Sequence, residues 1–260
     1  MGIPLYIIDA FTENRFAGNP AAVCPLTEWL DDKTLQSIAE ENNLSETAFF
    51  TRETGVFRLR WFTPKVEVNL CGHATLASAH VLFEHLKYKG SQIIFETKSG
   101  QLTVKKDGDL LLMDFPAYKP LPINMPEQLI QGLGSKPIEV LQSPETFLAV
   151  YDNEDDILSI APDFNLIEKL DMNCVIVTAK GSNSDFVSRF FAPKMGVPED
   201  PVTGSAHCTL IPYWSEKLNK TSLYAIQLSK RRGELYCEYL DGRVSIGGKA
   251  VTYSIGEINF

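Results

Sequence analysis

Two carboxylates, a turn of small residues and a histidine stand together at residues 199–207, which read EDPVTGSAH. An apolar run, CTLIPYW, follows directly. The pattern predicts a loop that leads into a buried helix, and Gly204 would let the backbone approach a ligand closely. The first N–H groups of a helix lack partners and lie at the positive end of its dipole. Gly204 and Ser205 therefore mark a candidate anion-binding turn.

A second stretch, residues 69–80, has the same composition and reads NLCGHATLASAH. Aligning its glycine with that of the first stretch pairs His73 with Ser205 and Cys71 with Thr203. Two such turns, far apart in one chain, indicate two similar halves that face each other and bind a small anion between them. The alternative is a pair of unrelated buried helices that each begin with glycine.

Glu46 and His73 are the best candidates for proton transfer. Glu46 lies in the uncharged run LSETAFF, residues 44–50, and a carboxylate among aromatic rings should have a raised pKa, which suits a general acid or base. His73 follows Gly72 at a predicted helix start, where the dipole favours the neutral imidazole as a donor to substrate. Each also has a structural interpretation, Glu46 as a capping or exposed turn residue and His73 as a satisfied buried histidine.

Asp200 and Cys71 have two interpretations as well. Asp200 either holds a substrate amino group or caps the helix behind it. The Cys71 thiol either lies at the positive end of the helix dipole, which would lower its pKa, or Cys71 is simply a small buried apolar residue. The sequence has no phosphate loop, dinucleotide fingerprint, catalytic-serine elbow or HExxH motif. We therefore expect chemistry by side chains alone, without cofactor or metal.

Composition excludes several classes of protein. The 260 residues include 24 Lys and Arg against 33 Asp and Glu, a net charge of −9, which argues against nucleic acid or anionic membrane as a partner. Five cysteines without a close pair suggest neither a disulfide framework nor a zinc site. The apolar N-terminus lacks a basic region, and no run could span a bilayer, so we expect a cytoplasmic protein.

The first half predicts one buried helix among short, mainly antiparallel strands. An amphipathic helix is expected at 31–42, and a helix apolar nearly all round at 74–86. Glu46 falls in a turn that leads into a strand. Strands are expected at 4–10, 21–25, 57–62, 91–97, 101–105 and 110–115.

Four prolines within residues 116–126 indicate a linker, after which the same plan recurs. Helices are expected at 126–133 and 204–218, with strands at 137–143, 146–151, 174–179, 186–192, 223–229, 234–240, 243–248 and 252–257. The sequence thus predicts an α+β protein with domains at 1–116 and 117–250, and a C-terminal strand, 251–260, that can return to the first domain.

Taken together, the motifs resemble the phenazine-biosynthesis isomerase (PhzF-like) family, within the diaminopimelate-epimerase-like fold. The matching pieces are DAFT at 9–12, GNPA at 18–21, LSETAF at 44–49, CGHATL at 71–76 and GVPEDPVTGSAH at 196–207. They occur in the family's order over nearly the whole chain.

The resemblance implies two domains of like topology, each a curved sheet around a central helix, with the active site where the two helix N-termini meet. It also implies a homodimer that needs no cofactor or metal and moves a proton on a small carboxylate-bearing substrate of the dihydro-hydroxyanthranilate type. Glu46 matches the family's acid/base. The residues that match its substrate contacts are His73, Asp200 and Ser205 by side chain, and Gly72 and Gly204 by backbone.

Two other functions remain open. Related racemases use two thiols, and here Cys71 fills the first position while Thr203 stands in the second, which disfavours that mechanism. Cys208, one turn into the helix, points elsewhere. The third possibility is a non-catalytic small-molecule binder on the same scaffold. The natural substrate is not given by the sequence.

Overall fold

A computed structural model describes residues 2–259 and divides the chain into two compact units. Unit 1 extends to Asp114 and also contains the segment from Ile246 onward, whereas unit 2 is Phe115–Ser245. The chain thus crosses between units near 114 and 245, against 116 and 250 in the sequence-based division. No helix among the described residues is both long and apolar enough to cross a membrane.

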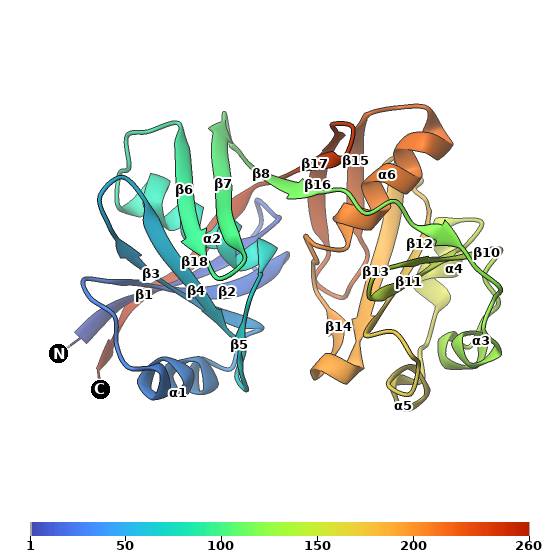
Figure 1. The fold of residues 1–260 in the computed structure, drawn as a ribbon, viewed down its shortest axis with the longest axis horizontal. Helices are drawn as coiled ribbons and strands as arrows, with labels where there is room; N and C mark the ends of the chain where they lie inside the picture. The colour runs from blue at the N-terminus through green and yellow to red at the C-terminus, as the bar shows by residue number, and fades with distance from the viewer. Residues whose placement is uncertain (1, 260) are drawn as a thin grey trace. The chain divides into compact units, whose positions relative to one another are not determined.

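Unit 1 is a curved, mainly antiparallel sheet around a central helix, α2 (Gly72–His80) (Figure 1). Its strands are β1 (Gly2–Ala10), β2 (Asn19–Leu26), β3 (Glu46–Arg52), β4 (Phe57–Phe62), β5 (Glu67–Val68), β6 (Gln92–Thr97), β7 (Gly100–Asp107), β8 (Leu110–Pro116) and β18 (Ala250–Asn259). Strands β2 and β3 pair in parallel, as do β4 and β6. The first and last described strands, β1 and β18, lie side by side and antiparallel.

Helix α1 (Asp32–Asn42) forms as its sequence predicts. The Asp31 carboxylate accepts a hydrogen bond from Thr34 N at 3.0 Å and caps the first turn. The buried face of α1 packs on Phe49 of β3, while α2 contacts β1, β2, β3 and β18. With a helix on each side, residues 47–51 of β3 are all buried.

The buried helix differs from its predicted range of 74–86. It begins at Gly72, and after His80 it widens into a π-helix, Val81–His85. In a regular α-helix, residues five apart point about 140° away from each other. The wider turn instead lets both His80 and His85 reach the Thr252 hydroxyl of β18, at 3.0 and 2.7 Å.

Unit 2 repeats this topology, which confirms the prediction of two like halves in an α+β fold. The strand pairings of unit 1 recur in unit 2 in the same order, with parallel pairs marked ‖. Unit 1 has β2‖β3, β3–β4, β4–β5, β4‖β6 and β6–β7. Unit 2 has β11‖β12, β12–β13, β13–β14, β13‖β15 and β15–β16. The strands are β9 (Leu121–Pro122), β10 (Glu139–Ser143), β11 (Thr146–Val150), β12 (Cys174–Lys180), β13 (Phe186–Ala192), β14 (Val197–Asp200), β15 (Ser222–Gln227), β16 (Gly233–Tyr239) and the first half of β17 (Arg243–Gly248), whose residues from Ile246 onward belong to unit 1. The helices are α3 (Glu127–Leu133), α4 (Glu154–Ser159), α5 (Phe164–Ile167) and α6 (His207–Leu218), with a 3₁₀ turn at Pro193–Met195.

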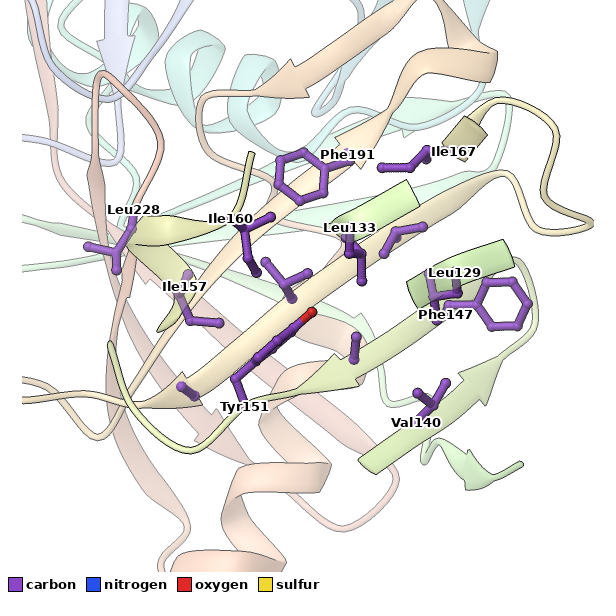
Figure 2. Close-up of a cluster of buried hydrophobic side chains, with 14 of the residues drawn as sticks. Leu129, Leu133, Val140, Phe147, Tyr151, Ile157, Ile160, Ile167, Phe191 and Leu228 are labelled. Atoms are coloured by element: carbon purple, nitrogen blue, oxygen red, sulfur yellow. The ribbon is translucent and has the colours of Figure 1, made fainter. Parts of the chain in front are cut away.

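The core of unit 2 lies on both faces of its sheet. Figure 2 shows one side, where side chains of α3, α4 and α5, such as Leu133, Ile157 and Ile167, belong to the same apolar cluster as strand residues including Phe191. On the other side Trp214 of α6 donates to the Thr178 hydroxyl at 2.9 Å and stacks on Phe186. Strand β12 is therefore buried along nearly its whole length.

Several elements differ from the sequence-based expectation. Helices α4 and α5 and strands β5, β9 and β14 were not predicted. The helix expected from Gly204 begins at His207 instead. Before it, His207 N donates to Gly204 O at 3.0 Å and Cys208 N to Ser205 O at 3.1 Å, because a tight turn precedes the first regular turn.

Candidate active site

Unit 1 brings together three of the residues singled out from the sequence. Glu46 is the first residue of β3 rather than part of the preceding turn, Cys71 is the N-cap of α2, and His73 is the second residue of α2. Glu46 Oε2 lies 3.2 Å from His73 Nε2, and Cys71 Sγ lies 3.5 Å from His73 Nδ1. Because α2 packs against β3, the fold places a carboxylate, an imidazole and a thiol side by side.

A fourth residue, Asn19, completes the cluster. Its Nδ2 lies 3.3 Å from His73 Nδ1. Asn19 is fully buried at the start of β2, and His73 is 5% exposed. The sequence marked the GNPA segment only as part of the family resemblance and assigned Asn19 no role.

The electrostatics of His73 follow from burial. Removal from water lowers the pKa of His73 to about 3, so the ring is neutral near pH 7. A neutral imidazole offers one donor and one acceptor nitrogen. The cause is desolvation, whereas the sequence argument relied on the helix dipole. By contrast, the Glu46 side chain retains 17% exposure, although its Oε2 atom is buried.

The same cluster could also hold a metal ion. Glu46, Cys71 and His73 each offer one ligand atom, and these atoms lie within 4.8 Å of one another. Carboxylate oxygen, thiolate and imidazole are ligands that zinc accepts. A carboxylate can exchange a proton with a substrate carbon without any metal bound to these three side chains.

Unit 2 holds the second group of predicted residues in a braced loop. Asp200 ends β14, and its carboxylate accepts a hydrogen bond from the Thr203 hydroxyl. Gln227 of β15 accepts from Thr203 N at 2.8 Å and donates to Asp200 O at 2.9 Å. The sequence gave no indication of Gln227, because an isolated glutamine in a strand carries no motif.

Gly204 and Ser205 follow in the tight turn before α6. Gly204 is buried and Ser205 is exposed. The predicted site residues thus fall into two groups, one in each unit. Unit 1 carries Glu46, Gly72 and His73, and unit 2 carries Asp200, Gly204 and Ser205.

His207 gives unit 2 a pH dependence of stability. Its Nδ1 lies 2.9 Å from Thr203 O, and burial lowers the pKa of His207 to about 4. Below the ordinary histidine pKa of about 6.5, His207 is protonated in the unfolded chain but stays neutral in the folded chain. The free energy of unfolding therefore falls as pH drops toward about 4. His73, with its pKa near 3, adds a second contribution of the same sign.

We therefore expect the free energy of unfolding to fall by about 1.4 kcal/mol per pH unit for each of these histidines between about pH 6 and pH 4.5. His207→Gln should remove the contribution of His207 and flatten the curve by that amount. Urea unfolding of both proteins at pH 7, 6 and 5 measures the slopes. Equal slopes would show that His207 is not held neutral.

Comparison with known proteins places this geometry in a family. A family model described as phenazine biosynthesis-like protein matches residues 8–256. A protein named an uncharacterized isomerase from Pseudomonas aeruginosa is 51% identical over 259 residues and is covered completely, as is this chain. A crystal structure of a PhzF-family phenazine biosynthesis protein from Enterococcus faecalis gives a TM-score of 0.98 at 46% identity, with 100% of both chains covered.

A more distant similarity concerns the fold only. A hydroxyproline epimerase from Agrobacterium vitis, solved with trans-4-hydroxy-L-proline, gives a TM-score of 0.63 at 10% identity over 99% of this chain and 92% of that one. This agrees with the epimerase-like fold expected from the sequence. The family match over residues 8–256, together with end-to-end relatives at 46% and 51% identity, shows that the chain belongs to the phenazine biosynthesis-like (PhzF) family.

Proposed function

We propose that the protein is a cofactor-independent isomerase that moves a proton on a small carboxylate-bearing substrate, with Glu46 as the general acid and base. The observation that carries this proposal is the contact between Glu46 and a neutral, buried His73, 3.2 Å apart at the junction of β3 and α2. A partly exposed carboxylate beside a neutral imidazole suits proton transfer. The relatives named as isomerases support the same class of reaction.

In this mechanism Glu46 removes a proton from one substrate carbon and returns it to another, so that the carboxyl group is unchanged at the end. His73, as a neutral donor, stabilises negative charge on Glu46 before the transfer or on the substrate during it. The backbone N–H group of Gly72, at the start of the helix that carries His73, contributes a fixed dipole to the same charge. Asp200 and Ser205 hold polar groups of the substrate.

The unit 2 geometry supports a binding role for Asp200. Its carboxylate already accepts from Thr203, and its main chain is held by Gln227. A carboxylate fixed in this way loses little freedom when it binds a substrate amino group or hydroxyl, which favours affinity. We propose further that the enzyme is a cytoplasmic homodimer, as the family resemblance implies.

The direct test is uptake of deuterium from heavy water by candidate substrates. The protein is incubated with cyclic and linear amino acids, hydroxy acids and dihydroaromatic carboxylates, and each compound is examined by mass spectrometry and NMR. The proposal requires exchange at carbon that proceeds after exhaustive chelation and depends on Glu46. Exchange that persists without Glu46, or that stops on chelation, would contradict it. A compound that binds but never exchanges would favour a non-catalytic binder.

One observation favours a second candidate, a racemase or epimerase that uses Cys71. Its Sγ lies 3.5 Å from His73 Nδ1, so the imidazole could assist a thiol. Burial raises the pKa of Cys24, Cys174 and Cys208 to about 12, so these thiols are not available as a second base.

We expect Cys71→Ala to retain activity within about tenfold, because the isomerase mechanism assigns the thiol no proton transfer, whereas loss of an acid/base group typically costs about 10²–10⁴ in rate. Cys24→Ala, which removes a fully buried thiol of the same unit, serves as the structural control. The measurement is the exchange rate on any substrate found by the screen. A loss of several orders of magnitude in Cys71→Ala alone would support the racemase.

A further inference from the structure

We propose that Asn19 is a positioning residue that fixes His73 in the tautomer with its proton on Nε2, so that this N–H faces Glu46. The inference rests on the proposed function for its catalytic meaning, but the tautomer itself is a property of the folded protein. Asn19 acts through His73 and is not itself a catalytic residue.

The geometry forms a line of three side chains. Asn19 Nδ2 lies 3.3 Å from His73 Nδ1, and His73 Nε2 lies 3.2 Å from Glu46 Oε2. Asn19 and His73 are almost completely buried. In such a setting polar atoms are nearly always hydrogen-bonded, so the amide and the ring constrain one another.

A tight turn before β2 sets the position of the Asn19 backbone next to His73. Gly18, directly before Asn19, has a left-handed φ of +64°, and a Cβ there would lie 2.1 Å from Ala10 O. Only glycine allows this close approach of β2 to β1. The buried Asp9 carboxylate braces the same turn by accepting from Phe16 N at 2.9 Å. The turn fixes the backbone from which the Asn19 side chain extends.

The hydrogen-bond chemistry then selects one tautomer. An amide NH₂ group can only donate, so a ring nitrogen that faces it must be the acceptor. The Cys71 thiol, 3.5 Å from the same Nδ1, can also donate to it. Because the ring is neutral, its single proton resides on Nε2, the ring nitrogen that lies 3.2 Å from Glu46 Oε2.

This arrangement has a consequence for Glu46. A donor near a carboxylate stabilises the ionised form, which is the form of Glu46 that accepts a proton in the proposed function. If the amide oxygen of Asn19 faced the ring instead, the proton would lie on Nδ1, and Glu46 would have to be protonated to donate to Nε2. The two arrangements differ in a measurable way.

The first test is the ¹⁵N NMR spectrum of the full-length protein labelled at histidine, without ligand. Protonated and unprotonated ring nitrogens resonate far apart, and the His73 signals are identified by their loss in His73→Asn. His207 is an internal reference of the opposite kind, because its Nδ1 donates to Thr203 O at 2.9 Å. We expect an Nε2–H tautomer for His73 and an Nδ1–H tautomer for His207. An Nδ1–H tautomer of His73 would overturn the proposal.

The second test is Asn19→Asp. An ionised aspartate only accepts hydrogen bonds, so His73 should switch to the Nδ1–H tautomer or become protonated at a higher pH than in the wild type. Gln36→Glu is the matched control, since Gln36 donates to Thr63 O at 2.9 Å in the same unit. An unchanged His73 signal in folded Asn19→Asp would contradict the proposal. If that variant does not fold, the wild-type spectrum still decides.

The outcomes separate this inference from the proposed function. The tautomer is read without turnover, so it holds or fails even if no substrate is found. If His73 carries its proton on Nδ1 while exchange still depends on Glu46, the role of Asn19 is wrong and the isomerase stands. If the tautomer is as expected but Glu46 is dispensable for exchange, the isomerase mechanism is wrong.

Discussion

Replacing Glu46 by Gln is expected to lower the rate of isotope exchange at the substrate carbon by about 10²–10⁴-fold, with substrate binding nearly unchanged. The amide has almost the same shape as the carboxylate and can still hydrogen-bond, but it cannot take up a proton near neutral pH. Removing the negative charge should also leave His73 neutral, because burial already sets its low pKa. The variant therefore tests proton transfer separately from the integrity of the site.

The measurement is the exchange rate for wild type and Glu46→Gln, together with a binding titration on the same compound. Glu53→Gln is the control, because Glu53 belongs to the same unit and its side chain forms an exposed ion pair with Arg58, at 2.9 Å. It should exchange as fast as the wild type. Equal rates in Glu46→Gln and wild type would show that another group is the base.

Replacing Arg189 by Met is expected to destabilise the protein by about 3–5 kcal/mol, because it breaks a largely buried ion pair. The Arg189 guanidinium binds both oxygens of Glu199, at 2.7 and 2.9 Å. It also donates to the main-chain oxygens of Ile157 and Ile160, at 3.1 and 2.8 Å. These carbonyls lie at the C-terminal end of α4, where helix carbonyls lack partners. The substitution thus removes the partner of a carboxylate and of a helix end together.

Unit 1 provides a matched comparison, because Arg60 and Glu67 form the same paired contact between the equivalent strands β4 and β5, at 2.8 and 2.9 Å. Glu67 also pairs with Lys98 at 2.5 Å, so Arg60→Met should cost less. Chemical unfolding of both variants measures the difference. Equal losses would mean that the α4 carbonyls contribute little. A larger fall in substrate affinity for Arg189→Met than for Arg60→Met would indicate that β14 holds Asp200 in place.

The longer elements of the fold could be predicted because local signals agree with the final structure. The helix at Asp32–Asn42 has a capping aspartate, helical spacing of apolar residues and a left-handed Asn43 at its end. Strand β4 was predicted at its observed bounds, Phe57–Phe62. The short helices α4 and α5, of six and four residues, have capping side chains, Asn153 and Asp163, but are too short for apolar residues to repeat at helical spacing. Helices of this length are stabilised mainly by packing, here of their apolar residues on the sheet.

The site could be predicted only where a residue belongs to a recognisable segment. Glu46, His73 and Asp200 stand in such segments, and the resemblance gave them roles that stay predictions. The contacts that hold them could not be found in this way. Asn19 and His73 are 54 positions apart, and Gln227 is 24 positions from Thr203. A sequence pattern describes neighbours along the chain, whereas these pairs are created by the sheet.

The pairing of β1 with β18 has a consequence for the synthesis of the protein. Strand β1 takes part of its hydrogen bonds from β18, the last described strand, Ala250–Asn259. Until β18 has been translated, β1 can pair with β2 on one side only, and its other edge has no partner strand. Unit 2, Phe115–Ser245, is continuous and can fold as soon as it leaves the exit tunnel. Domains generally fold in the order of their synthesis, but in this chain the unit that starts first is the last to be completed.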